Sequence, residues 1–184
     1  VIPMRKFGTM YTGRRRTSRW TIPASPLQGP PRPQRRQFVR ILVLNGPNLN
    51  LLGVREPGLY GTVDYEGLVE LIRAECERLG IEAEFYQSNH EGDLVDAIQN
   101  ARGRCDGLVL NPGAYTHTSI AILDALKAVA LPAAEVHITD IAQREPFRQV
   151  SYAGMACQAH FIGQGLQGYL NAVRFIRQTV GAEG

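Results

Sequence analysis

The segment that decides the fold is ILVLNGPNLNLLGVREPGLYG, residues 41–61. Its first four residues are apolar and predict a short buried β-strand. The Asn-Gly-Pro that follows is typical of a turn, so the strand is expected to end at Leu44. In open α/β folds, ligands bind in the loops that follow the carboxyl ends of parallel strands. We therefore expect the loop after this strand to belong to a binding site.

The same loop carries Arg55 and Tyr60, five residues apart. Arginine is always protonated, and a nearby positive charge favours the ionised form of a tyrosine hydroxyl. An arginine beside a tyrosine can therefore make a base that works near neutral pH. Taken alone, Tyr60 would be interpreted as a surface residue of a turn.

From Arg40 onward, the sequence alternates between segments typical of strands and of helices. Strands are expected at 41–44, 82–87, 107–110, 133–138 and 159–162, and helices at 64–79, 90–101, 118–130 and 166–180. Such alternation predicts a parallel sheet covered by helices on both faces. We expect an α/β fold, namely a flavodoxin-like three-layer αβα sandwich with five parallel strands in the order 2-1-3-4-5.

The net charge of +3 is unevenly distributed. Residues 1–40 hold ten of the 20 basic residues and none of the 17 acidic ones, so residues 41–184 carry a net charge of −7. Nucleic-acid binding normally requires a basic face. We therefore expect no nucleic-acid partner for the folded domain.

Residues 1–39 are predicted to form a basic Pro/Arg-rich extension that is disordered or not native, and residues 40–184 to form the catalytic domain. Three alternatives stay open for this extension. It resembles an organelle transit peptide in its Arg, Ser and Thr content, although its prolines disfavour an amphipathic helix. It is also compatible with an over-long gene model. An RNA-associated extension would bind in a salt-sensitive way.

The cysteine and apolar patterns favour a cytoplasmic protein. The three cysteines are far apart in the sequence, which favours reduced thiols over a disulfide framework. No Cys/His cluster with the spacing of a metal site is found, and no apolar run approaches the ~18 residues of a membrane span.

Polar residues follow the predicted strands at the points where these strands end. They are Asn48 after the first strand, Asn111 and His117 after the third, Glu135 and His137 on the fourth, and Arg144 and Arg148 beyond it. Glu135 and His137 are two residues apart, so both point to the same face of an extended strand. The set suits proton abstraction at one atom of an anionic substrate and acid-assisted departure at another.

Structural interpretations compete with these assignments. A lone histidine such as His137 is more often a core residue, although a carboxylate beside it needs a partner. Thr116 or Thr118 would serve as a helix N-cap, which would make the His117 segment structural. The GxGxxG pattern at 163–168 lacks the following strand and acidic residue of a dinucleotide site, so we expect close helix–strand packing there.

Six blocks together resemble the type II dehydroquinases. They are NGPNLNLLGVREPGLYG (45–61), SNHEG (88–92), LNPGAYTHTS (110–119), EVHITD (135–140), REPFR (144–148) and GQGLQGYLNA (163–172). They follow the order and spacing of that family across about residues 40–180. The resemblance implies elimination of water from 3-dehydroquinate to give 3-dehydroshikimate, in the shikimate pathway that leads to chorismate and the aromatic amino acids. It implies no metal and no organic cofactor.

The resemblance also implies roles for the catalytic residues. Tyr60, held as phenolate near Arg55, would remove a proton next to the ketone. Asn48 would hold the water that stabilises the enolate. His137, oriented by Glu135, would protonate the departing hydroxyl.

The substrate contacts and the assembly are implied in the same way. Asn111, Ile138 and Thr139 would hold the carboxylate, and His117 and Arg148 the ring hydroxyls. The loop with Arg55 and Tyr60 would act as a lid. Family members are typically homododecamers built from trimers, in which Asp124 would reach a neighbouring subunit's site.

Departures from the family pattern are small. Thr139 and Asp140 stand where Ser and Asn are common, and Asp140 would place a negative charge near the substrate carboxylate. Residues 142–143 replace a frequent His-Ala pair. The alternative function is a nucleotide- or flavin-binding module on the same fold, which Pro47 disfavours because it removes a backbone donor from the phosphate-binding loop.

Overall fold

The structure of the chain is a computed structural model that describes residues 38–53 and 63–182. The expected base, Tyr60, and its partner Arg55 lie outside the described residues, as does the extension up to residue 37. The described elements all belong to one unit that spans residues 33–184. Within the described ranges, no helix has the length and apolar character needed to cross a membrane.

The described sheet has five parallel strands in the order β2-β1-β3-β4-β5. They are β1 Val39–Asn45, β2 Ile81–Gln87, β3 Gly107–Asn111, β4 Ala133–His137 and β5 Ala159–Ile162. The order predicted from the sequence is therefore confirmed. The predicted strand positions are correct to within two residues at each end.

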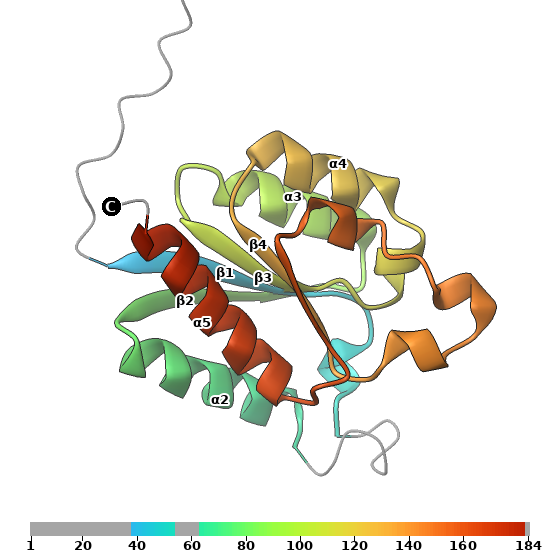
Figure 1. Cartoon of the computed structure of the whole chain (residues 1–184), viewed down its shortest axis with the longest axis horizontal. Helices are drawn as coiled ribbons and strands as arrows, with labels where there is room; N and C mark the ends of the chain where they lie inside the picture. Colours follow the sequence, from blue (N-terminus) through green and yellow to red (C-terminus); the bar gives the residue numbers. More distant parts are fainter. Residues whose placement is uncertain (1–37, 54–62, 183–184) are drawn as a thin grey trace, which may run out of the picture. The chain divides into compact units, whose positions relative to one another are not determined.

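Helices cover both faces of this sheet, as expected for a three-layer fold (Figure 1). They are α2 Tyr65–Arg78, α3 Glu91–Ala101, α4 Ile120–Val129 and α5 Gln167–Ala182. The helices α2 and α5 lie on one face, and α3 and α4 lie on the other. The strand β1 shows the consequence, because Ile41 and Val43 pack toward the first pair of helices while Leu42 and Leu44 pack toward the second. Burial on both faces explains its continuous apolar run.

Short 3-10 turns follow β1, β3 and β4 in the chain. They are η1 Leu49–Leu51, η2 Gly113–His117, η3 Ile141–Gln143, η4 Pro146–Arg148 and η5 Ala153–Ala156. Of the polar residues singled out by the sequence, His117 and Arg148 lie in these turns, Asn48 and Arg144 lie directly beside them, and Asn111 and His137 end β3 and β4. The fold therefore gathers those residues at the carboxyl ends of three neighbouring strands.

The start of α4 differs from the prediction. The helix was expected from residue 118 with Thr116 or Thr118 as a cap, but the cap is Ser119, whose hydroxyl accepts from the Ile122 amide at 2.9 Å. Both cap assignments are wrong because the residues before Thr118 already form the turn η2. The side chain of Thr116 is fully buried and is used elsewhere.

The end of α2 agrees with the sequence. The helix begins after Asp64, whose carboxylate accepts from the Gly67 amide at 2.8 Å. It ends before Gly80, which has a φ of +65° and is the expected C-terminal glycine.

At the GxGxxG pattern, a Cβ built on Gly168 would lie 3.3 Å from both the Phe161 carbonyl oxygen and Val136. This glycine thus serves close helix–strand packing, as expected.

The loops that follow β1 and β3 touch each other through backbone atoms. The Gly46 amide donates to the Asn111 carbonyl at 2.8 Å, and a Cβ on Gly46 would overlap the Pro112 carbonyl. Only glycine permits this approach, because the atoms that a side chain would meet belong to the backbone.

Gly46→Ala is therefore expected to lower the free energy of unfolding by about 1–3 kcal/mol, the usual cost of overpacking. The measurement is urea unfolding of the variant and of the unaltered protein. Gly92→Ala is the matched control, since Gly92 lies in the first turn of α3 with nothing within 4 Å of its built Cβ. The control should be neutral or slightly stabilising. Equal stability of the two variants would contradict the steric account of Gly46.

Candidate active site

A cavity of about 310 Å³ lies at the carboxyl ends of β1, β3 and β4. Seven of the residues predicted from the sequence line it, namely Asn48, Asn111, His117, His137, Ile138, Thr139 and Arg148. Arg144 lines it as well. The expected convergence of the strand ends on one cleft is thus confirmed for these residues.

The other predicted site residues fall into three groups. Glu135 lies directly behind His137 on β4. Asp124 is exposed on α4 and does not line the cavity, so the structure does not bring it to the other site residues. Arg55 and Tyr60 lie outside the described residues.

The centre of the site is a buried pair formed by Glu135 and His137. The Nε2 atom of His137 lies 2.9 Å from Oε1 of Glu135, and the two residues are 5% and 0% exposed. They occupy alternate positions of β4, so both side chains point to the same side of the strand. The pair predicted from the i, i+2 spacing is formed.

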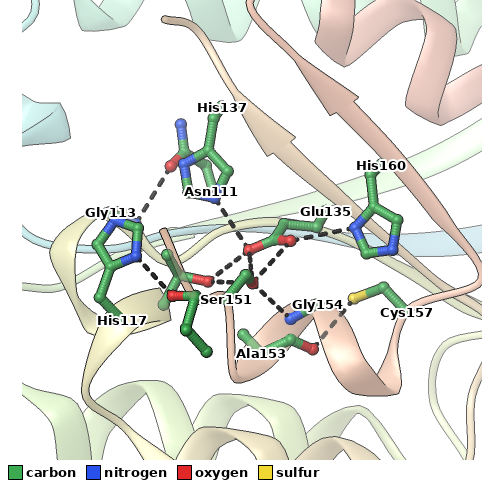
Figure 2. A network of polar contacts seen from close by, with 12 residues as sticks. Asn111, Gly113, His117, Glu135, His137, Ser151, Ala153, Gly154, Cys157 and His160 are labelled. Carbon is green, nitrogen blue, oxygen red and sulfur yellow. Dashed lines mark hydrogen bonds and ion pairs between the residues drawn. The ribbon is translucent and has the colours of Figure 1, made fainter. Parts of the chain in front are cut away.

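Glu135 is held by more groups than His137 alone (Figure 2). Thr116 donates to its Oε1 atom at 2.5 Å, and Ser151 lies 2.8 and 3.0 Å from its two oxygens. The Nδ1 atom of His160 lies 3.2 Å from Oε2. These are the contacts that a carboxylate on a central strand needs, because a buried charge without partners is very costly.

These contacts determine the charge of Glu135. Burial raises its pKa, but hydrogen bonds from His137, Thr116 and Ser151 outweigh burial and hold the pKa at about 2, against an ordinary 4.5. The carboxylate is therefore ionised at neutral pH. Because a carboxylate can only accept, His137 must carry a proton on Nε2.

Two turns meet to build this arrangement. Thr116 comes from η2 and Ser151 from the segment between η4 and η5, and their hydroxyl oxygens are 2.7 Å apart. The Tyr152 amide donates to the Thr116 carbonyl at 2.7 Å, which fastens the segments to each other. Sequence reasoning missed Thr116 and Ser151 as partners of Glu135, because their role depends on where two distant turns meet.

His117 is oriented by the backbone of the same segment. Its Nδ1 atom lies 2.8 Å from the Val150 carbonyl, which can only accept, so Nδ1 carries a proton and donates it. The ring stacks on that of His137, with centroids 6.4 Å apart and planes at 16°. Two imidazoles with different roles therefore face the cavity side by side.

Asn111 is fixed by a buried polar network. Its Nδ2 atom donates to the Tyr169 hydroxyl at 3.0 Å, and its Oδ1 atom accepts from the Gly113 amide at 3.1 Å. The Tyr169 hydroxyl donates to Asn45 at 2.7 Å. Burial raises the pKa of Tyr169 above its ordinary 10.0, so this hydroxyl stays protonated. Tyr169, on α5, is a third residue whose role the sequence alone did not reveal.

Asn48 reaches the rim of the cavity through an unusual backbone conformation. Its φ is +67°, a left-handed value that asparagine tolerates better than most residues. Its amide donates to the Asn89 side chain at 2.9 Å. The predicted loop residue is thereby held at the cavity.

The charge of Asp140 is directed at its own turn. Its carboxylate accepts from the Ala142 amide at 2.9 Å and from the Gln143 side chain at 2.9 Å, and the residue does not line the cavity. The two positively charged residues Arg144 and Arg148 do line it. The concern that Asp140 would repel an anionic substrate is therefore reduced.

No group of three or more His, Cys, Asp or Glu side chains comes together as metal ligands within residues 38–53 and 63–182. The polar groups that line the cavity are instead imidazoles, amides and guanidinium groups, with a carboxylate behind one imidazole. Such groups transfer protons and bind anions. The fold and the site together define an α/β enzyme with an acid–base centre at the carboxyl edge of its sheet.

Comparison with known proteins agrees with this class. The model of the class II dehydroquinase family matches residues 39–177, and the chain belongs to this family. It is 54% identical over 134 residues to "3-dehydroquinate dehydratase 1" of Corynebacterium efficiens, which covers 73% of this chain and 89% of the relative. It is 50% identical over 136 residues to "Catabolic 3-dehydroquinase 1" of Aspergillus terreus, and this match covers 74% of this chain and 90% of that relative.

Solved structures show the same likeness. The type II dehydroquinase of Butyrivibrio crossotus is similar with a TM-score of 0.75 and 48% identity, over 77% of this chain and 99% of that one. The type II dehydroquinase of Propionibacterium acnes is similar with a TM-score of 0.72 and 39% identity, over 76% and 96%.

The pKa of Glu135 predicts how stability depends on pH. Because the pKa in the fold, about 2, lies below the ordinary 4.5, the stabilisation is present above pH 4.5 and is lost as the pH falls toward 2. Glu135→Gln should remove this part of the acid dependence, up to about 1.4 kcal/mol per pH unit. Urea unfolding at several pH values between 2 and 7 measures it.

Glu77→Gln on the exposed side of α2 is the control and should follow the unaltered protein. If Glu135→Gln keeps the acid dependence of the unaltered protein, then Glu135 is not the ionised group described above.

Proposed function

We propose that the chain is a 3-dehydroquinate dehydratase of the shikimate pathway, which eliminates water from 3-dehydroquinate to give 3-dehydroshikimate. Membership of the class II dehydroquinase family supports this proposal, as do the names of relatives that are about half identical. The observation that carries it is the position of His137 on the wall of the cavity, with the buried Glu135 directly behind it. An ionised carboxylate behind an imidazole is the arrangement expected of a proton donor.

His137 is the acid in this proposal. Its Nε2 atom is engaged by Glu135, which leaves Nδ1 as the ring nitrogen for the substrate. The hydrogen bond to Glu135 holds the ring so that Nδ1 faces the cavity. His137 would then protonate the hydroxyl that leaves as water.

Tyr60 is the base, with Arg55 beside it to favour the phenolate. Both residues lie in 54–62, outside the described residues. The described residues on either side of this segment support the assignment. Leu52 lines the cavity, and a Cβ built on Gly53 would lie 3.0 Å from the Cα atom of Asp64, so the described residues on the two sides of this segment lie close to each other and near the cavity.

The remaining cavity residues would bind the substrate. Asn111, Ile138 and Thr139 are proposed to hold its carboxylate, and His117 and Arg148 its hydroxyls. Asn48, at the rim, would hold the water that stabilises the enolate. Arg144 and Arg148 share one carboxylate, that of Glu145, at 3.7 and 2.9 Å, so these three residues keep one net positive charge beside the cavity. This charge supports the choice of an anionic substrate, because opposite charges attract.

We further propose a cytoplasmic homododecamer in which Asp124 reaches a neighbouring copy. Its exposure on α4, close in sequence to the 57% exposed Ile120, supports a contact surface there. The three cysteines are free thiols, as expected in a reducing compartment. The extension expected over residues 1–39 is proposed to end before Val39, because Val39 is the first residue of β1 and pairs with Ile81.

The reaction is tested by the ultraviolet absorbance of the conjugated product formed from 3-dehydroquinate. Tyr60→Phe and His137→Gln should each lower kcat by about 10²- to 10⁴-fold, the usual contribution of a general base or acid. Tyr86→Phe is the control for the tyrosine, since Tyr86 is an exposed residue of β2, and it should leave kcat unchanged. Substantial turnover by Tyr60→Phe would refute the assignment of the base.

Deleting residues 1–37 should leave kcat and the size of the assembly unchanged, because β1 begins only at Val39. Kinetics and light scattering on the full chain and the shortened chain provide the comparison. A loss of activity or of assembly would show that the extension takes part in either.

A further inference from the structure

Glu135 contacts two imidazoles, one through each of its oxygens. Oε1 lies 2.9 Å from Nε2 of His137, and Oε2 lies 3.2 Å from Nδ1 of His160 (Figure 2). We propose that His160 is a positioning residue for the proton donor His137 and acts through Glu135. This inference rests on the proposed function, in which His137 is the acid.

The contact with His160 is set by the register of the sheet. In the parallel pairing of β4 with β5, Glu135 lies directly opposite His160. Paired residues of neighbouring strands point to the same face of a sheet, so the imidazole is presented to the carboxylate by the backbone of a strand. A residue on a strand holds its partner more firmly than one on a loop does.

The turn η5 leaves room for this contact. A Cβ built on Gly154 would lie 2.9 Å from Cε1 of His160 and would overlap Oε2 of Glu135. The Gly154 amide instead donates to Ser151 at 2.9 Å. Glycine at this position therefore lets the imidazole, the carboxylate and the hydroxyl share one small space.

The two oxygens of Glu135 are unequally held. Oε1 has three partners, namely His137, Thr116 and Ser151. Oε2 has Ser151, which it shares with Oε1, and His160. Without His160, Oε2 would be held only by the Ser151 hydroxyl, which it shares with Oε1. The last torsion of a glutamate side chain has only a weak intrinsic preference, so that torsion alone does not fix the carboxylate. Rotation about that torsion moves Oε1 away from His137.

His160 does not act on the substrate directly. Its side chain is 44% exposed, against 7% for that of His137, and it does not line the cavity. The carboxylate therefore lies between an imidazole at the cavity and an imidazole that reaches solvent. This placement makes His160 a residue that orients Glu135 from behind.

The test compares two substitutions at residue 160. His160→Val removes the donor, whereas His160→Asn keeps an N–H at about the position of Nδ1. His160→Val should lower kcat about five- to tenfold, as for one lost hydrogen bond, with KM within about twofold, because the substrate contacts stay in place. His160→Asn should recover most of kcat. The control His90→Val, at an exposed histidine before α3, should change neither constant.

Crystal structures of the two variants give a readout that does not depend on activity. In His160→Val the carboxylate should turn so that the distance from Oε1 to His137 exceeds 2.9 Å, and in His160→Asn it should return. An unchanged carboxylate and kcat in His160→Val would overturn the inference. The inference would also be overturned if His160→Val lost both kcat and Tm and if His160→Asn did not restore kcat. If the unaltered protein fails to convert 3-dehydroquinate, the proposed function fails, and the orientation of the carboxylate still decides the role of His160.

Discussion

The structure of the site depends on one buried charge. Glu135 lies on a central strand with no exposure to solvent, and an ionised carboxylate is tolerated there only with several donors. Those donors come from η2, from the segment before η5, from β5 and from β4 itself. Satisfying this charge therefore fixes how the turns after β3 and β4 lie against each other.

The same requirement links the fold to the chemistry. A strand of the sheet supplies Glu135 and His137, and η2, which carries one donor to the carboxylate, also lines the cavity. On the other side of the cavity, the buried amides and hydroxyl of Asn111, Tyr169 and Asn45 hold the ends of β1 and β3 together. Both halves of the site are thus positioned by polar networks that the hydrophobic core encloses.

Much of this could be predicted from the sequence, and the rest depends on tertiary contacts. Periodicity predicted the strands, because parallel strands buried on both faces leave an apolar pattern. Their order was predicted as the most economical topology for alternating strands and helices. The spacing of Glu135 and His137 predicted their pairing. The roles of Thr116, Ser151 and His160 were not predicted, since each is set by the meeting of segments that are distant in sequence. The cap of α4 was misassigned because Thr116, Thr118 and Ser119 all have side chains suited to that position.

The close approach of Gly46 to Pro112 has a consequence for engineering the binding site. Because the two loops touch through backbone atoms, an insertion or deletion in one of them displaces the other. Loop exchange between relatives would therefore have to transfer both segments as a unit. The segment after β4 is fastened to η2 in a similar way, because the Tyr152 amide donates to the Thr116 carbonyl and the Val150 carbonyl accepts from His117. An exchange of residues 141–152 would therefore have to include η2.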